Sequence, residues 1–119
     1  VERRGTSDLA VVGHGPDRKV AGNSLRVRRG AVLYHGTLLD AFDLDAVTRL
    51  LRHPPREPGY RAGRPHGEFL ANPGLGAAAL RDIVRRAFGA ATPARDWPRE
   101  RAARLAAERF TSVAWTRRL

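Results

Sequence analysis

Residues 8–40 read DLAVVGHGPDRKVAGNSLRVRRGAVLYHGTLLD, and this stretch decides the fold. The cluster at 14–17 and the pair Arg29-Gly30 are turn sequences, and they separate runs rich in β-branched and other apolar residues. These runs predict three strands, at 8–13, 18–28 and 31–40. Because the connections are short, consecutive strands should pair antiparallel. The sequence therefore predicts an antiparallel meander over about residues 7–40.

Helical patterns follow the meander. Asp43 is a good N-cap and is followed by apolar residues at helical spacing, which predicts a helix at about 43–52. Residues 77–88 carry an amphipathic pattern that ends at Gly89. We expect both helices to pack against the meander, which gives an α+β fold.

Two other segments have a different character. Residues 54–76 hold five of the eight prolines and five glycines, which predicts an ordered loop with little regular structure. Residues 90–119 are expected to form a linker, a helix from Pro98 to Phe110 and a tail.

The composition excludes several classes of protein. The 119 residues include no Cys, so they provide no disulfide scaffold and no thiol nucleophile. Apolar runs fall far short of the ~20 residues of a membrane helix, and no basic-then-apolar leader opens the sequence, so we expect a cytoplasmic protein without a membrane partner. The chain has no Met and begins at Val1, and we expect it to be a fragment of a longer protein.

The positive charge of the chain is unusual in kind. Lys plus Arg total 22 against 12 Asp plus Glu, which gives a net charge of +10, and Lys19 is the only lysine. A lysine is a compact point charge that the planar guanidinium of arginine does not replace. This single lysine is either a functional cation or a chance exception in an arginine-rich composition.

Two glycine-interrupted strand segments are the candidate site. In the first, Lys19 precedes Gly22, Asn23 and Ser24. This segment combines a cation, a glycine that lets a ligand approach the backbone closely, and two hydrogen-bonding side chains. This set suits an anionic ligand such as a carboxylate or phosphate. The second is His35-Gly36-Thr37 on the next strand. We expect Gly22 and Gly36 to lie close together and to face an open groove; the alternative is an ordinary bulged strand beside a packed histidine.

These segments resemble the lipoate–protein ligase family, within the biotin/lipoate ligase and octanoyltransferase superfamily. The resemblance covers residues 5–51 strongly and extends weakly to about Asn72. Its motifs are an Asp-Leu strand, Arg-Lys-Val-Ala-Gly-Asn-Ser, an arginine-rich hairpin and His-Gly-Thr-Leu-Leu before an Asp-rich helix start. The resemblance implies a biotin/lipoate ligase-like catalytic domain that condenses lipoate or octanoate with ATP and Mg²⁺ to an acyl-adenylate. It implies transfer of the acyl group to a lysine of a lipoyl domain, in a 2-oxoacid dehydrogenase or a glycine cleavage H-type protein.

The same resemblance implies roles for individual residues. Lys19 takes the position of the essential lysine, which stabilises the charge of the transition state. Asp8 takes an acidic position that implies a Mg²⁺ or phosphate-side ligand. The remaining residues implied to bind ATP and the acyl-adenylate are Gly22, Asn23, His35, Gly36 and Thr37.

Some features depart from the family pattern. Ser7 stands where the family has Asn, and nothing matches the upstream Arg-Arg-x-x-Gly-Gly-Gly segment. We therefore expect the chain to be the second half of the catalytic domain, inactive until a missing N-terminal half or a second chain completes it. Residues 53–56 read His-Pro-Pro-Arg where one group of transferases has a Pro-Cys-Gly loop, which favours the ligase.

Two alternatives stay open. An octanoyl or lipoyl transferase of the same superfamily remains, because another transferase group places its Cys upstream of the first strand. The charge of +10, with Arg26, Arg28 and Arg29 together, also fits a basic nucleic-acid-binding module. No aromatic residues interleave with these arginines, so nucleic-acid binding is a weaker hypothesis than an enzyme of this superfamily. Lipoate, octanoate and biotin are not distinguished. Arg61, Arg64 and His66 are expected to lie in a solvated loop.

Overall fold

The computed structural model describes residues 1–94 and 96–118, and it divides into two compact units, residues 1–83 and 84–119. The first unit contains the whole sheet and the second contains the C-terminal helices. The boundary falls inside helix α3 (Ala77–Ala87). Within the described residues, no helix is long and apolar enough to cross a membrane.

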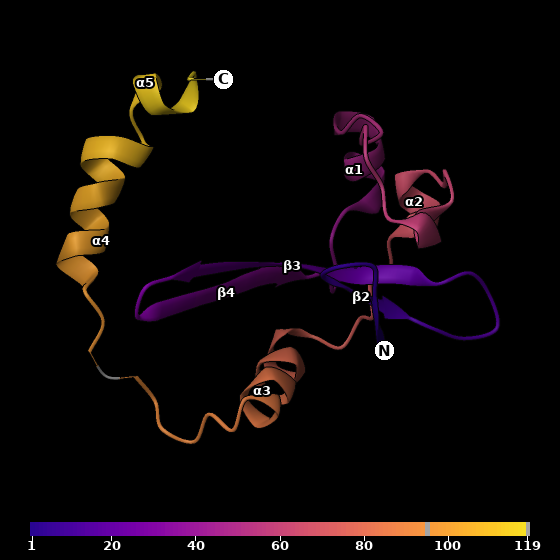
Figure 1. The fold of residues 1–119 in the computed structure, drawn as a ribbon, viewed down its shortest axis with the longest axis horizontal. Coiled ribbons are helices and arrows are strands. Elements are labelled where there is room, and N and C mark those ends of the chain that lie inside the picture. The colour runs from indigo at the N-terminus through magenta and orange to yellow at the C-terminus, as the bar shows by residue number, and fades with distance from the viewer. Residues whose placement is uncertain (95, 119) are drawn as a thin grey trace. The chain divides into compact units, whose positions relative to one another are not determined.

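The first unit is built on a four-stranded antiparallel sheet with strand order β1-β2-β3-β4 (Figure 1). Its strands are β1 (Glu2–Arg4), β2 (Asp8–Val11), β3 (Arg18–Arg28) and β4 (Ala31–Leu38). The α+β fold and the antiparallel meander are confirmed. The meander has one strand more than predicted, because β1 pairs with β2 through Glu2↔Ala10 and Arg4↔Asp8.

The sheet register places the glycines of the predicted groove side by side. Strand β3 pairs with β4 through Gly22↔Thr37, Asn23↔Gly36 and Ser24↔His35. Strands β3 and β4 continue as a long hairpin that turns at Gly30, whose φ of +78° favours glycine (Figure 1). Gly22 and Gly36 are therefore on neighbouring strands and one register position apart.

Two short helices follow the hairpin and lie on the same side of the sheet (Figure 1). Helix α1 (Leu44–Leu50) begins where predicted, since the side chain of Asp43 accepts a hydrogen bond from the Ala46 N–H at 2.8 Å. The segment predicted as an irregular loop contains a 3-10 helix, η1 (Gly59–Arg61), and helix α2 (His66–Phe69). Leu70 forms a parallel bridge with Lys19 in β3, so this segment packs on the sheet.

A small core holds the first unit together. Its most buried apolar side chains come from β2, β3, α1 and α2, and among the described residues they are Ala10, Val20, Ala21, Val47 and Phe69. The core therefore lies where α1 and α2 cover the start of β3, and it fixes the part of the strand that carries Lys19. Helix α3 confirms the helix predicted at 77–88 and buries none of its described residues, and its packing on the meander stays a prediction.

The second unit contains α4 (Arg99–Leu105), the π-helix η2 (Ala106–Phe110) and α5 (Val113–Thr116). The helix predicted from Pro98 to Phe110 is present, with its last turns widened to a π-helix. Phe110 and Trp115 pack edge to face with ring centroids 4.8 Å apart. Residues 95 and 119 of the predicted linker and tail lie outside the described residues.

Candidate functional site

A β-bulge in β3 sets the orientation of Lys19. Leu9 pairs with Ala21 and Ala10 pairs with Lys19, so Val20 has no partner on β2. In a regular strand, residues three positions apart point to opposite faces. The extra residue at Val20 shifts this alternation, and Lys19 and Gly22 therefore share one face with Asp8.

The side chain of Lys19 crosses directly over Gly22. A Cβ built at Gly22 would lie 3.0 Å from Nζ and 3.1 Å from Cε of Lys19. Contacts this short are tighter than a methyl group normally tolerates, so glycine leaves the space that the lysine occupies. The bulge and the glycine together direct the ammonium group into an open cleft.

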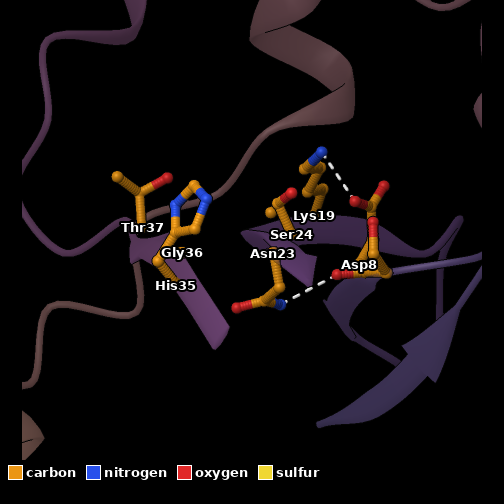
Figure 2. A pocket seen from close by; sticks show the side chains of 9 residues that line it. Asp8, Lys19, Asn23, Ser24, His35, Gly36 and Thr37 are labelled. Atoms are coloured by element: carbon orange, nitrogen blue, oxygen red, sulfur yellow. Dashed lines mark hydrogen bonds and ion pairs between the residues drawn. The ribbon is translucent and has the colours of Figure 1, made fainter. Parts of the chain in front are cut away.

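The cleft has a volume of about 340 Å³ and lies over β3 and its two neighbouring strands (Figure 2). All seven residues predicted for the site line it: Asp8, Lys19, Gly22, Asn23, His35, Gly36 and Thr37. Ser7 and Ser24 complete the lining. The expected groove between the two glycine-containing segments is thus present, while the chemical role of each residue stays a prediction.

Asp8 holds the ammonium group of Lys19. Its Oδ1 lies 2.7 Å from Nζ, and the Asp8 side chain is 10% exposed against 27% for Lys19. The other carboxylate oxygen, Oδ2, accepts a hydrogen bond from the Tyr60 hydroxyl at 2.9 Å. The lysine is therefore held from one side, and the remaining donors of its ammonium group are available to a ligand in the cleft.

Asn23 and Gly36 shape the wall of the cleft. The Asn23 side chain points away from Lys19 and donates a hydrogen bond to the Ser7 carbonyl at 2.8 Å (Figure 2). A Cβ at Gly36 would collide with the Asn23 amide oxygen and lie 2.7 Å from the Gly22 carbonyl oxygen. Gly36 therefore allows the close packing of β4 on β3, and Asn23 ties β3 to the segment before β2.

The donor set does not fit the expected Mg²⁺ ligand role of Asp8. Among the described residues Asp8 is the only carboxylate that lines the cleft, and both its oxygens already have partners in Lys19 and Tyr60. Within residues 1–94 and 96–118, no group of three or more His, Asp or Glu side chains could hold a metal ion. Asp8 is better suited to orienting Lys19 than to holding a metal ion.

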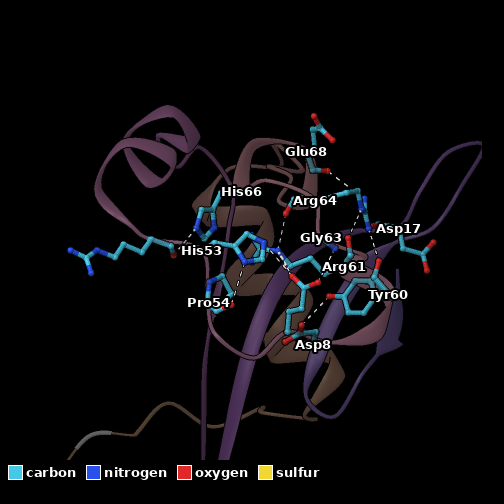
Figure 3. A network of polar contacts seen from close by, with 12 residues as sticks. Asp8, Asp17, His53, Pro54, Tyr60, Arg61, Gly63, Arg64, His66 and Glu68 are labelled. Carbon is cyan, nitrogen blue, oxygen red and sulfur yellow. Dashed lines mark hydrogen bonds and ion pairs between the residues drawn. The ribbon is translucent and has the colours of Figure 1, made fainter.

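The sequence did not indicate a role for Tyr60, nor the burial of the arginines that follow it (Figure 3). Arg61 is only 4% exposed, and Arg64 donates hydrogen bonds to the carbonyl oxygens of Tyr60 at 2.7 Å and Asp17 at 2.8 Å. Both guanidinium groups lie over the ring of Phe69. The prediction of a solvated loop was therefore wrong for these arginines, because cation–π contacts and backbone carbonyls bind them.

Tyr60 lies between this arginine cluster and the cleft. Its ring packs against Phe69 at a centroid distance of 5.1 Å. Burial, followed by the hydrogen bond to Asp8, raises the pKa of Tyr60 well above its ordinary value. The hydroxyl is therefore protonated and serves as a donor to Asp8. The sequence feature that could have indicated a role for Tyr60 is an aromatic residue followed by closely spaced arginines in a proline-rich segment.

The fold is a small α+β domain whose sheet carries an open cleft with a lysine ammonium group in it. The family model of the lipoyl protein ligase A/B catalytic domain matches residues 1–67, which is more than half of the chain and includes the whole cleft and the Tyr60 segment. The chain belongs to this family, whose members are ligases and transferases that use lipoyl-type acyl groups. No curated protein and no solved structure matches the chain.

Proposed function

We propose that the chain provides the lysine-bearing half of the catalytic domain of an ATP-dependent lipoate–protein ligase. The observation that carries this proposal is the placement of Lys19, whose ammonium group lies in the cleft over Gly22 and is held by Asp8. Upstream residues or a second chain would complete the domain.

The proposed reaction has two steps. The carboxylate oxygen of lipoate or octanoate attacks the α-phosphorus of ATP, and pyrophosphate leaves as the acyl-adenylate forms. The amine of an acceptor lysine on a lipoyl domain then attacks the acyl carbonyl, and AMP leaves as the amide bond forms. In both steps negative charge builds on oxygens beside the acyl–phosphate junction.

Lys19 is suited to stabilise this charge. A point charge on a flexible stem can approach a carboxylate oxygen and an α-phosphate oxygen at once. Because Asp8 already holds the ammonium group, little reorganisation is needed when charge develops, and preorganised donors of this kind contribute most to rate. The backbone at Gly22 and Gly36 carries no side chain, so a nucleotide can approach the sheet closely.

The test is lipoate-dependent ATP–pyrophosphate exchange by the protein expressed from its complete reading frame. We expect exchange with lipoate or octanoate, and a weaker or absent response to biotin. The labelling of a lipoyl domain is measured separately, so that activation and transfer are distinguished. Absence of exchange with every acid, in a protein that folds, would contradict the proposal.

A transferase is the second candidate, because the family includes both ligases and transferases. An acyl-carrying thiol would have to come from outside these 119 residues, since they contain no Cys. Labelling of the lipoyl domain from octanoyl-acyl carrier protein without ATP would favour the transferase. Labelling that requires ATP and the free acid favours the ligase.

A further inference from the structure

The hydroxyl group of Tyr60 has a position that the proposed chemistry does not yet explain. Tyr60 does not line the cleft, yet its hydroxyl lies 2.9 Å from Oδ2 of Asp8, whose other oxygen holds Lys19 at 2.7 Å. The three side chains therefore form a continuous chain from the arginine cluster to the cleft. Such a chain can fix a charged group that would otherwise sample several rotamers.

The loop that carries Tyr60 is itself firmly held. Arg64 binds the Tyr60 carbonyl oxygen at 2.7 Å, and the Tyr60 ring contacts Phe69, which is 3% exposed. The ring also approaches Gly5, where a Cβ would lie 3.8 Å from a ring carbon. The hydroxyl therefore has little freedom to leave Asp8.

The alternative arrangements of Asp8 show what the tyrosine prevents. Asp8 is 8% exposed, so a carboxylate oxygen without a donor there would lose hydration that nothing replaces. The Asp8 carboxylate without Tyr60 would have to rotate so that both oxygens share the ammonium group or reach water. Either change would alter where the Lys19 ammonium group lies relative to Gly22.

We propose that Tyr60 is a positioning residue, which fixes the Asp8 carboxylate by one hydrogen bond and thereby holds the Lys19 ammonium group over Gly22 for the reaction. The kinetic consequence rests on the proposed function. The structural consequence, an altered environment of the Lys19 ammonium group, does not depend on it.

The decisive variant is Tyr60→Phe, which removes the hydroxyl and keeps the ring against Phe69. The matched control is Tyr34→Phe, since Tyr34 is the only other tyrosine and is 54% exposed on the hairpin. We expect Tyr60→Phe to lower the kcat of exchange roughly 3- to 10-fold with little change in the KM for ATP. Tyr34→Phe should leave both unchanged.

A spectroscopic measurement separates positioning from loss of folding. With [¹⁵N]lysine labelling, the Nζ resonance of Lys19 is identified by its loss in Lys19→Arg. Tyr60→Phe should shift or broaden this resonance and leave the backbone amide spectrum of the sheet unchanged; Tyr34→Phe should leave the resonance in place. An unchanged Nζ resonance in folded Tyr60→Phe would overturn the inference.

A double-mutant cycle completes the test. In a Lys19→Ala background, Tyr60→Phe should cost no further activity, because its effect passes through the lysine. An undiminished effect in that background would overturn the proposed route. If the Nζ resonance moves as expected while no variant or parent shows exchange, the proposed ligase function fails and the positioning of Lys19 stands.

Discussion

Replacement of Lys19 tests whether this lysine has a functional or only a structural role. The structure predicts a large loss of reaction rate and a much smaller loss of folding stability. Lys19→Ala removes the ammonium group from the cleft and leaves the Asp8 carboxylate, 10% exposed, with Tyr60 as its remaining partner. The loss of rate and the loss of stability therefore arise from different contacts and can be measured apart.

The stability cost follows from the burial of the pair. Exposed ion pairs contribute about 0–1 kcal/mol, and removing one partner of a fully buried pair costs roughly 3–5 kcal/mol. The Lys19 side chain is 27% exposed, so this pair is neither fully exposed nor fully buried. We therefore expect Lys19→Ala to lower the free energy of unfolding by about 1–2 kcal/mol, between the two ranges. Adding Asp8→Asn removes the stranded carboxylate and should recover most of that stability.

The rate cost should be much larger. Loss of a preorganised donor to developing charge typically lowers kcat on the order of 10²–10³-fold. Lys19→Arg should fail almost as badly, because a planar guanidinium group cannot take the narrow path over Gly22, where a methyl carbon would already lie 3.0 Å from Nζ.

The assay is lipoate-dependent ATP–pyrophosphate exchange, with thermal unfolding measured on the same samples. The double variant Lys19→Ala/Asp8→Asn should unfold near the temperature of the parent and remain nearly inactive. If that variant, or Lys19→Ala itself, exchanges pyrophosphate at the parental rate, Lys19 is an ordinary surface cation and the argument from the cleft is refuted.

The remaining predictions concern the glycines and the loop that support Lys19. Gly22→Ala should leave the unfolding free energy within about 0.5 kcal/mol of the parent, since the flexible lysine tip can move aside, but should lower exchange at least ~10-fold. Gly36→Ala should instead destabilise the chain by about 1–3 kcal/mol in urea unfolding, because its Cβ meets backbone 2.7 Å away; equal stabilities of the two variants would contradict this difference. Arg64→Ala removes four hydrogen bonds to backbone carbonyl oxygens and a cation–π contact, so a loss of about 2–3 kcal/mol is expected in the same measurement, and a loss under about 0.5 kcal/mol would show that the loop does not depend on it. Because the pKa of Tyr60 is raised, the folded chain keeps a proton that the unfolded chain releases above about pH 10. The stability that Tyr60 contributes should therefore be complete below pH 10 and fall as the pH rises beyond it. Thermal unfolding of the parent and of Tyr60→Phe between pH 8 and 11 tests this, and Tyr60→Phe should lack the decline.

The strands were predictable where an apolar side-chain pattern is bounded by residues that favour turns. Strand β3 lies at the predicted residues 18–28, and the turn at Gly30 lies where the sequence requires it. Strand β1 could not be predicted in the same way, since Glu2–Arg4 has no apolar alternation. It forms because Gly5, with φ of +55°, turns the chain back so that the backbone can pair with β2.

The site was predictable in its membership and not in its geometry. A strict two-residue alternation would place Lys19 and Gly22 on opposite faces of β3, and only the bulge at Val20 brings them together. The glycine in this strand indicates a bulge as one alternative, but the position of the bulge at Val20 depends on the pairing with β2 and has no local signature. The contribution of Tyr60 was hidden for a similar reason, because it reaches Asp8 across 52 residues of sequence.

The position of β4 has a consequence for the behaviour of this chain in solution. Within the described residues β4 is an outer strand of the sheet, its eight residues are all exposed, and they include no Lys, Arg, Asp, Glu or Pro. A free strand edge of this composition is a template for intermolecular pairing and aggregation. The neighbouring strand opposes it, because Arg26 and Arg28 stand beside Leu33 and Ala31 and bring like charges together when two such edges approach. The charge of the arginine-rich hairpin should therefore disfavour self-association through this edge, and a higher salt concentration should weaken that repulsion.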